Sequence, residues 1–211
     1  MLNAVGREIP QEVLDETGKT VFQGSYQFDQ HEYIKTAVKA KTRIGGSGSK
    51  LESSIQEVLQ KCNAHDGMRI SFHHHFREGD LVVMQVMNVI HELGYKDITI
   101  CASSLSKAQD DLVPMIEDGT VTHIETSGVR GKIGEAISEG KLKGIAILRS
   151  HGGRVRAIET GETKIDIAFI GAPSCDEYGN CRGVGGNSNC GVLSYAAIDA
   201  EYAENVVILT D

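Results

Sequence analysis

"DLVVMQVMNVIHELG", residues 80–94, is followed by "DITICAS", residues 97–103, and these two segments carry the clearest structural signal in the chain. Apolar residues recur in the first segment at helical spacing, Asp80 is a candidate N-cap, and Gly94 is a typical helix stop. The second segment has the β-branched, apolar character of a buried strand. The pair therefore predicts a helix that leads directly into a strand.

The same alternation continues on both sides of this unit. The spacing predicts further helices over residues 50–62, 110–117 and 132–139, and further strands over 68–73, 121–125, 144–148 and 165–171. In the first of these helices Leu51, Ile55, Val58 and Leu59 share one face. Five or six such units predict an α/β fold with a mainly parallel, helix-covered sheet over residues 41–211. Residues 1–40 are expected to form a polar, irregular N-terminal arm.

Composition narrows the class of protein. The 211 residues are 40% apolar and 24% charged, which allows an ordinary hydrophobic core. The apolar runs are too short to span a bilayer, and the N-terminus lacks the basic and apolar regions of a signal peptide, so we expect a cytoplasmic protein without a membrane partner. A net charge of −8 disfavours a general nucleic-acid-binding surface.

The cysteines favour reduced thiols over a disulfide framework or a metal site. Their number, five, is odd, and no secretory signal accompanies them. Cys175, Cys181 and Cys190 form no CxxC pair and have no nearby histidine to complete a tetrahedral zinc site. We therefore expect no metal.

In a parallel sheet, ligands bind beyond the carboxyl ends of the strands, so the loops there are the candidate sites. The first loop is "RIGGSGSK", residues 43–50, directly before the helix expected at Leu51. Its backbone N–H groups and the helix N-terminus could hold an anion such as a cofactor phosphate. The candidate cofactor-binding residues are Gly45, Gly46, Ser47, Gly48 and Ser49. The alternative is a flexible connection in which Ser49 is only an N-cap.

The second loop is "SFHHHFREGD", residues 71–80, at the end of an expected strand. His73, His74, His75 and Arg77 are candidate donors to a carboxylate substrate. Strand geometry turns His73 and His75 to one side and His74 to the other, so one metal ion could take only two of the three. The alternative is a strand end whose histidines bond to backbone groups.

The third loop is "GAPSCDEYGNCRGVGGNSNCG", residues 171–191. Its "DEYGN" predicts a tight turn, which is a sufficient structural reason for Asp176, Gly179 and Asn180. A single tight turn does not require the further residues Gly185, Gly186 and Asn187. The two glycines could allow the backbone to approach a cofactor closely, and the asparagine side chain could donate a hydrogen bond to it. On this interpretation, replacing Gly186 should weaken cofactor binding with little loss of fold.

Three segments carry a family resemblance: "DGMRISFHHHFREGD" (66–80), "AFIGAPSCDEYGN" (168–180) and "YAAIDAEYAENVVILTD" (195–211). From about Gly6 to Asp211, the chain resembles the N-terminal half of citrate lyase α subunits, which are relatives of the coenzyme A transferases. The resemblance implies two similar α/β halves with the active site in the cleft between them, of which this chain is the first half.

The resemblance also implies an activity, cofactor and partners. The family exchanges acetate for citrate on an acyl-carrier-protein thioester, whose prosthetic group derives from dephospho-coenzyme A. Its partners would be the β subunit and the γ subunit, which is the acyl carrier protein, and a homo-oligomer is expected. Related transferases use a glutamate nucleophile, and no glutamate here has the matching Glu-Asn-Gly-like setting, so the catalytic carboxylate is expected outside this chain. Glu177 is the local alternative, but its turn position offers no desolvation.

Two other functions are compatible with these loops. A sensory α/β domain could use the glycine loops to bind a sugar phosphate without chemistry. A non-catalytic scaffold within a multi-subunit lyase would bind no small molecule at all.

Overall fold

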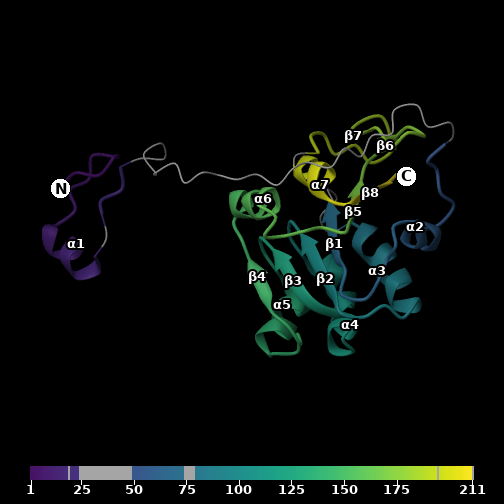
Figure 1. The fold of residues 1–211 in the computed structure, drawn as a ribbon, viewed down its shortest axis with the longest axis horizontal. Coiled ribbons are helices and arrows are strands. Elements are labelled where there is room, and N and C mark those ends of the chain that lie inside the picture. Colours follow the sequence, from purple (N-terminus) through teal and green to yellow (C-terminus); the bar gives the residue numbers. More distant parts are fainter. Residues whose placement is uncertain (19, 24–48, 74–78, 194, 211) are drawn as a thin grey trace. The chain divides into compact units, whose positions relative to one another are not determined.

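The computed structural model describes residues 1–211 except 19, 24–48, 74–78, 194 and 211 (Figure 1). The chain divides into two units, Met1–Lys35 and Thr36–Asp211.

The first unit contains a helix where an irregular arm was expected. Helix α1 (Gln11–Thr17) follows Pro10 and ends at Gly18, which has a φ of 62° and donates its N–H to the Leu14 carbonyl. Leu14 and Val21 are both 8% exposed. Proline before the first turn and glycine after the last are the usual boundaries of a helix, and they explain why this short polar segment folds locally.

The second unit is built on a parallel sheet, as the sequence predicted. Its six strands lie in the order β4-β3-β2-β1-β5-β8, and every pairing between them is parallel (Figure 1). The strands are β1 (Arg69–His73), β2 (Ile98–Ala102), β3 (Val121–Thr126), β4 (Ala146–Leu148), β5 (Ile167–Gly171) and β8 (Asn205–Leu209). Two short strands, β6 (Ser174–Cys175) and β7 (Cys181–Arg182), form a separate antiparallel ribbon.

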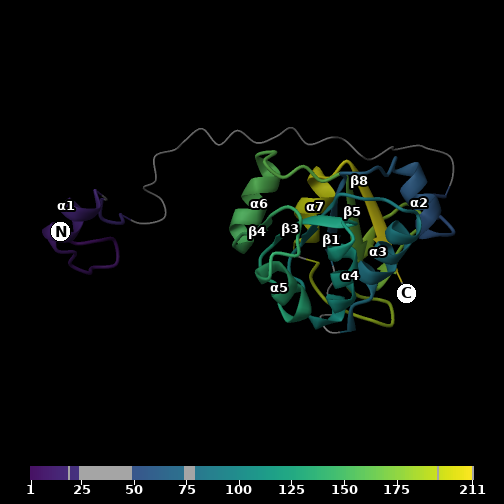
Figure 2. The same cartoon turned by 90° about the horizontal axis from the view of Figure 1, so that it is seen from below.

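Helices cover both faces of the sheet. They are α2 (Ile55–Lys61), α3 (Val82–Glu92), the 3₁₀ helix η2 (Lys107–Leu112), α4 (Val113–Glu117), α5 (Gly131–Ser138), α6 (His151–Glu159) and α7 (Ala196–Tyr202). Helices α6 and α7 have no counterpart among the elements expected from the sequence. Figure 2 shows them together on one side of the sheet, with α3, α4 and α5 on the other.

Helix α3 confirms the predicted helix, but it is two residues shorter at each end than expected and its N-cap is Leu81, not Asp80. Its inner face buries Val82, Val83, Val86, Met87 and Ile90. The Asp80 carboxylate accepts the N–H of Val82 at 3.1 Å, although the helix itself begins after Leu81. Gly94 has a φ of 80°, which terminates the helix.

Helix α2 is shorter than predicted, and this changes the interpretation of the first glycine loop. It begins at Ile55, because Ser54 is the N-cap and its hydroxyl accepts the N–H of Glu57 at 3.2 Å. Leu51 lies before the helix and is 70% exposed. The expectation that a helix starts at Leu51, with Ser49 as its N-cap, is therefore wrong.

The two faces of the sheet differ in character. One face is apolar: Phe72 of β1 and Phe169 of β5 stack with ring centroids 5.9 Å apart, against the core formed with α3. Burial of each phenylalanine side chain stabilises the folded state by about 1.5–3 kcal/mol relative to leaving that side chain exposed. The alternate residues of β1, namely Arg69, Ser71 and His73, point to the opposite face, which α6 and α7 cover. This second face is polar at its centre.

Candidate functional site

The strand order places the candidate site between β1 and β5. The chain winds from β1 toward β4 on one side and from β5 to β8 on the other, so the direction reverses at the β1–β5 pair. In that pair His73 lies beside Ile170, and both strands end there. Open α/β sheets bind ligands in the crevice at such a reversal, beyond the carboxyl ends of the strands.

A cavity of about 350 Å³ lies at this position. Its wall comes from the start of α3, the ends of β5 and β8, and the third glycine-rich loop. The lining residues are Gly79, Leu81, Val82, Gln85, Gly171, Ala172, Ser188, Leu209 and Thr210. The described wall is thus mostly apolar, with uncharged polar groups from Gln85, Ser188 and Thr210, a composition typical of small-molecule sites.

The turn after β6 has the structure that its sequence predicts. The Asp176 carboxylate accepts the N–H groups of Tyr178 and Asn180 at 3.0 and 2.9 Å and the Asn180 side-chain amide at 2.8 Å. Gly179 has a φ of 88°. Lys50 joins this turn from outside, donating its N–H to the Glu177 carbonyl at 2.9 Å. Asp176 is therefore structural, and Glu177 is an exposed turn residue.

The glycine-rich loop over residues 183–191 is packed against its own backbone. A Cβ on Gly183 would overlap the Gly191 carbonyl, and a Cβ on Gly186 would overlap the Pro173 carbonyl. Gly185 has a φ of 96°, and its N–H donates to the Asn189 side chain at 2.8 Å. Asn187 is exposed. Packing alone accounts for Gly186, so the expectation that this glycine can be replaced with little loss of fold is wrong.

Gly186→Ala should destabilise the protein by about 1–3 kcal/mol, because the backbone of Gly186 or Pro173 must shift to admit the new methyl group. Gly152→Ala is the matched control: it lies in α6 with open space around its Cβ position, and alanine there should stabilise by about 0.5–1 kcal/mol. Urea unfolding of both variants measures the difference. Equal stability of the two variants would contradict the packing argument.

The remaining predicted site residues are only partly described. His73 is 3% exposed and points into the protein, so the structure gives it internal contacts. Ser49 accepts the N–H of Leu51 at 3.1 Å. Gly45, Gly46, Ser47, Gly48, His74, His75 and Arg77 lie outside the described residues, and their roles stay predictions.

A buried polar cluster lies behind the carboxyl end of β1, between the sheet and helices α6 and α7. Arg154 makes a bidentate ion pair with Asp199, with both N···O distances at 2.8 Å. The Ser71 hydroxyl donates to Asp199 and accepts from Arg154 at 3.2 Å. Nε2 of His73 lies 3.8 Å from Asp199 Oδ2, and the Tyr195 ring stacks near both His73 and Arg154. The cluster thus joins β1, α6 and α7.

Burial and pairing act in opposite directions on these charges. Burial opposes the charged form of Arg154, but the hydrogen bond and charge of Asp199 raise the pKa of the guanidinium overall. Burial raises the pKa of Asp199, and Arg154 and Ser71 oppose that rise. The hydrogen bond from Arg154 Nη2 to Asp199 Oδ2 is charge-assisted, and it favours the ionised pair. Loss of either partner would leave a buried charge alone.

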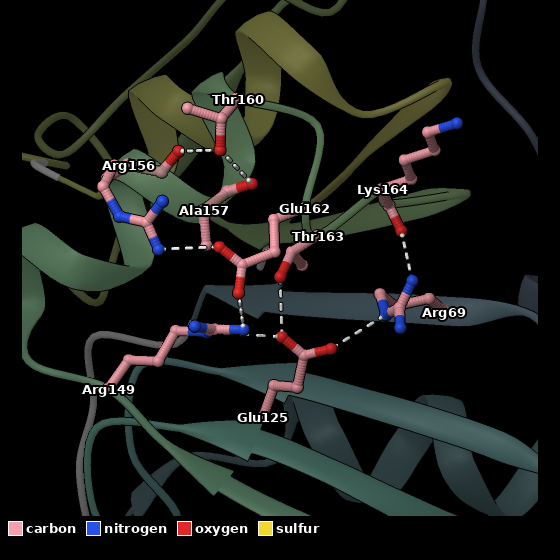
Figure 3. Close-up of polar contacts among 9 residues, drawn as sticks. All are labelled: Arg69, Glu125, Arg149, Arg156, Ala157, Thr160, Glu162, Thr163 and Lys164. Carbon is pink, nitrogen blue, oxygen red and sulfur yellow. Dashed lines mark hydrogen bonds and ion pairs between the residues drawn. The ribbon is translucent and has the colours of Figure 1, made fainter. Parts of the chain in front are cut away.

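A second polar cluster lies on the same face of the sheet (Figure 3). The Glu125 carboxylate of β3 contacts Arg69 Nε at 3.2 Å and Arg149 Nε at 3.7 Å, and it accepts the Thr163 hydroxyl at 2.7 Å. Arg69 also donates to the Lys164 carbonyl at 3.2 Å. These contacts fasten the segment between α6 and β5 onto the sheet.

Glu162 extends this cluster to the surface. Arg156 and Arg149 bind its two carboxylate oxygens at 2.6 and 2.8 Å (Figure 3). Hydrogen bonds, from Arg156 first and from Arg149, hold the pKa of Glu162 below its ordinary value. The pair Arg156–Glu162 is exposed, so solvent screens it and its contribution to stability is small.

Sequence reasoning missed Glu125, Arg154 and Asp199, because charged residues on amphipathic elements are normally solvent-facing. Their one available signal is the alternation of polar and apolar residues in "RISFH", residues 69–73. A central parallel strand is usually apolar throughout, so polar residues at every second position predict buried polar partners.

The described residues contain neither a metal-binding cluster nor a membrane-spanning helix. No group of three or more histidine, cysteine, aspartate or glutamate side chains there is arranged to hold a metal ion. No helix within the same described ranges has the length and apolar character needed to cross a membrane.

Comparison with known proteins identifies the family. The profile of the family "Citrate lyase, alpha subunit" matches residues 48–211. The chain belongs to this family. It is similar to the citrate lyase α chain of Haemophilus influenzae, with 49% identity over 186 residues, which cover 88% of this chain and 37% of the relative. The Escherichia coli α chain is 48% identical over 162 residues, which cover 77% of this chain and 32% of the relative. The chain thus spans about a third of these curated citrate lyase relatives.

Solved structures agree with the family assignment. A crystal structure of a citrate lyase α subunit from Streptococcus mutans in complex with citrate has a TM-score of 0.83 and 46% identity, covering 99% of this chain and 40% of that one. RipA from Yersinia pestis has a TM-score of 0.52 at 15% identity, covering 74% of this chain and 35% of RipA, and shares the fold alone. The expected α/β fold with a mainly parallel, helix-covered sheet is confirmed, and it matches that of a citrate lyase α subunit.

Proposed function

We propose that this chain is part of a citrate:acyl-carrier-protein transferase, which converts acetyl-carrier thioester and citrate into citryl-carrier thioester and acetate. The observation that carries the proposal is the family match across residues 48–211, which includes all of the sheet and the cavity. The Streptococcus mutans relative binds citrate, which supports citrate as the substrate here.

The proposed chemistry is covalent catalysis by a glutamate. Its carboxylate attacks the acyl thioester to give a mixed anhydride, and the released thiolate then attacks the enzyme acyl group to give an enzyme thioester and free acetate. Citrate reverses the sequence and leaves as the citryl thioester. Glu177 is exposed in a turn, and we place the nucleophile outside residues 1–211.

The cavity suits the uncharged arm of the thioester better than it suits citrate. Apolar side chains line most of its described wall, and Gln85, Ser188 and Thr210 supply polar groups for amides along the arm. Three carboxylates would need cationic partners, which this described wall does not offer. We assign the cavity to the arm.

Citrate requires donors beside that cavity. His73 ends β1, and Gly79 lines the cavity. The sequence places His74, His75 and Arg77 in the five residues between them. These side chains are our proposed citrate donors.

The carrier and the assembly follow from the same proposal. The thioester would be carried on the prosthetic group, derived from dephospho-coenzyme A, of an acyl carrier protein, the γ subunit. A β subunit would receive the citryl thioester. We further propose a homo-oligomeric α subunit in the cytoplasm.

An affinity series on the full-length protein tests the proposal. Calorimetry should detect binding of dephospho-coenzyme A, coenzyme A and citrate, and no binding of a hexose phosphate. Binding of the sugar phosphate alone would instead indicate a sensory domain, and binding of none of the four would indicate a scaffold.

Two variants of α3 locate the arm. Gln85 is exposed on α3 and lines the cavity, whereas Asn88 is exposed on the same helix outside the lining. Gln85→Trp should fill the cavity mouth and weaken binding of dephospho-coenzyme A by about tenfold, roughly one lost contact of 1.4 kcal/mol. Asn88→Trp should leave it unchanged. Equal effects of both variants on binding would show that the thioester arm does not occupy this cavity.

A further inference from the structure

Two cysteines face each other across the β6–β7 ribbon. Cys175 and Cys181 are directly opposed in its antiparallel register. The next pair toward the turn carries a backbone hydrogen bond, from the N–H of Asp176 to the Asn180 carbonyl at 3.0 Å. Because hydrogen-bonded and non-hydrogen-bonded pairs alternate, Cys175 and Cys181 occupy a non-hydrogen-bonded pair, whose Cα atoms are about 4.5 Å apart. A disulfide accepts Cα separations of about 4.4–6.8 Å.

Both side chains are partly exposed and both thiols are free. The Cys175 thiol donates to the Asp176 carbonyl at 3.2 Å, a weak contact that a disulfide could replace. The turn between the two cysteines is already fixed by the bonds that Asp176 accepts from Tyr178 and Asn180. The register of the two strands is therefore compatible with a bond between the two sulfurs.

We propose that Cys175 and Cys181 form a redox-modification site, a dithiol that a small disulfide such as oxidised glutathione converts into a cross-strand disulfide. The thiolate of one cysteine attacks a glutathione sulfur, forms a mixed disulfide and expels one glutathione thiolate. The thiolate of the second cysteine attacks the protein sulfur of that mixed disulfide and expels the other. Two protein S–H bonds are lost and one S–S bond forms. The two electrons and two protons leave in two molecules of reduced glutathione.

The neighbouring cysteines are less suitable partners. Cys190 donates its N–H to the Gly183 carbonyl at 3.0 Å, so it lies beside Gly183, two residues beyond Cys181 on its chain. A diagonal position of this kind separates Cα atoms by about 7–8 Å, beyond the usual range of a disulfide. Cys101 is 1% exposed on β2 and has no access to the oxidant.

The reaction should be slow at neutral pH and faster in alkali. Burial, followed by the nearby Asp176, raises the pKa of Cys175. Burial, followed by Cys175, raises the pKa of Cys181. The attacking thiolate is then a minor species, and the rate of oxidation should rise about tenfold per pH unit below that pKa.

Tryptic mapping tests the proposal on the native protein. After incubation with oxidised glutathione, the remaining thiols are alkylated in denaturant and the protein is digested. The peptide Ile165–Arg182 contains both cysteines and no internal Lys or Arg, whereas Cys190 lies on the following peptide. The expected product is therefore Ile165–Arg182 lighter by two hydrogens and unalkylated, with Cys190 alkylated.

Three variants and one internal control make the outcome decisive. Cys190→Ser should give the same product, and Cys175→Ser or Cys181→Ser should stop at the mixed disulfide with glutathione. Alkylation of Cys101 only after denaturant is added reports that the fold was intact. A linkage between the two peptides, or a native protein whose Cys175 and Cys181 both remain alkylatable at alkaline pH, would overturn the proposal.

Discussion

Residues 1–211 alone should transfer no acyl group, although the full-length protein should be active. Exchange between a carboxylate and a thioester without an enzyme nucleophile would depend on direct attack by citrate, which is a weak nucleophile at neutral pH. On the proposed two-half architecture, one half of the cleft would leave the reacting groups in water, so positioning and electrostatic stabilisation of the oxyanion would be lost. Each of these effects accounts for several orders of magnitude in rate.

The measurement is a comparison of three samples: residues 1–211, a citrate lyase α chain of the relatives' full length that contains this unit, and residues 1–211 mixed with the C-terminal part of such a chain. Circular dichroism establishes that the short chain is folded. Borohydride should trap an enzyme thioester in the active samples, on a glutamate beyond residue 211. Activity of the short chain, or trapping at Glu177, would place the nucleophile inside this α/β unit.

Arg154→Met should cause the largest loss of stability among single substitutions in α6. It leaves the Asp199 carboxylate buried with no cationic partner, and breaking such a pair costs about 3–5 kcal/mol. For a unit of this size the melting temperature should fall by roughly 10 °C. Arg156→Met is the matched control on the same helix, where the exposed pair with Glu162 is screened by solvent and its loss should change stability little.

A second variant separates charge from packing. Arg154→Met combined with Asp199→Leu removes both charges, so much of the loss should be recovered even though Ser71 loses its partners. Thermal unfolding of the three variants measures the coupling between the two sites. If the double variant were no more stable than Arg154→Met, the lone buried carboxylate would not be the cause.

The sequence predicted the sheet because its signals are local. The periodicity of apolar residues predicts both the helix over 82–92 and the strand over 98–102. Gly94 also indicates where the helix ends. Helix α6 was missed because His151, Gly152 and Gly153 form its first turn, and glycines there mimic a loop. The predicted start of helix α2 was too early. Leu51 continues the helical spacing of apolar residues, but the helix is capped by Ser54 and begins after it.

The candidate site was harder to predict because its parts are distant in the chain. The loop over residues 171–191 contributes Gly171, Ala172 and Ser188 to the cavity wall, whereas the predicted cofactor residues Gly185, Gly186 and Asn187 are not among the lining residues. However, the role given to Gly186 depended on which atoms lie opposite it, and no local pattern reveals the Pro173 carbonyl. The contacts of Ser71 with Arg154 and Asp199 join residues that are 83 and 128 positions apart.

The polar layer between the sheet and helices α6 and α7 also acts as an alignment device. Apolar burial is non-directional, so an apolar contact surface positions a helix only through the shapes of its side chains. A charge-assisted hydrogen bond adds a direction, since it weakens when either its length or its angle changes. The Arg154–Asp199 pair, tied to Ser71, therefore fixes how far α6 and α7 can travel along β1. These contacts therefore help to keep the carboxyl ends of β1 and β5 at a fixed position relative to the cavity.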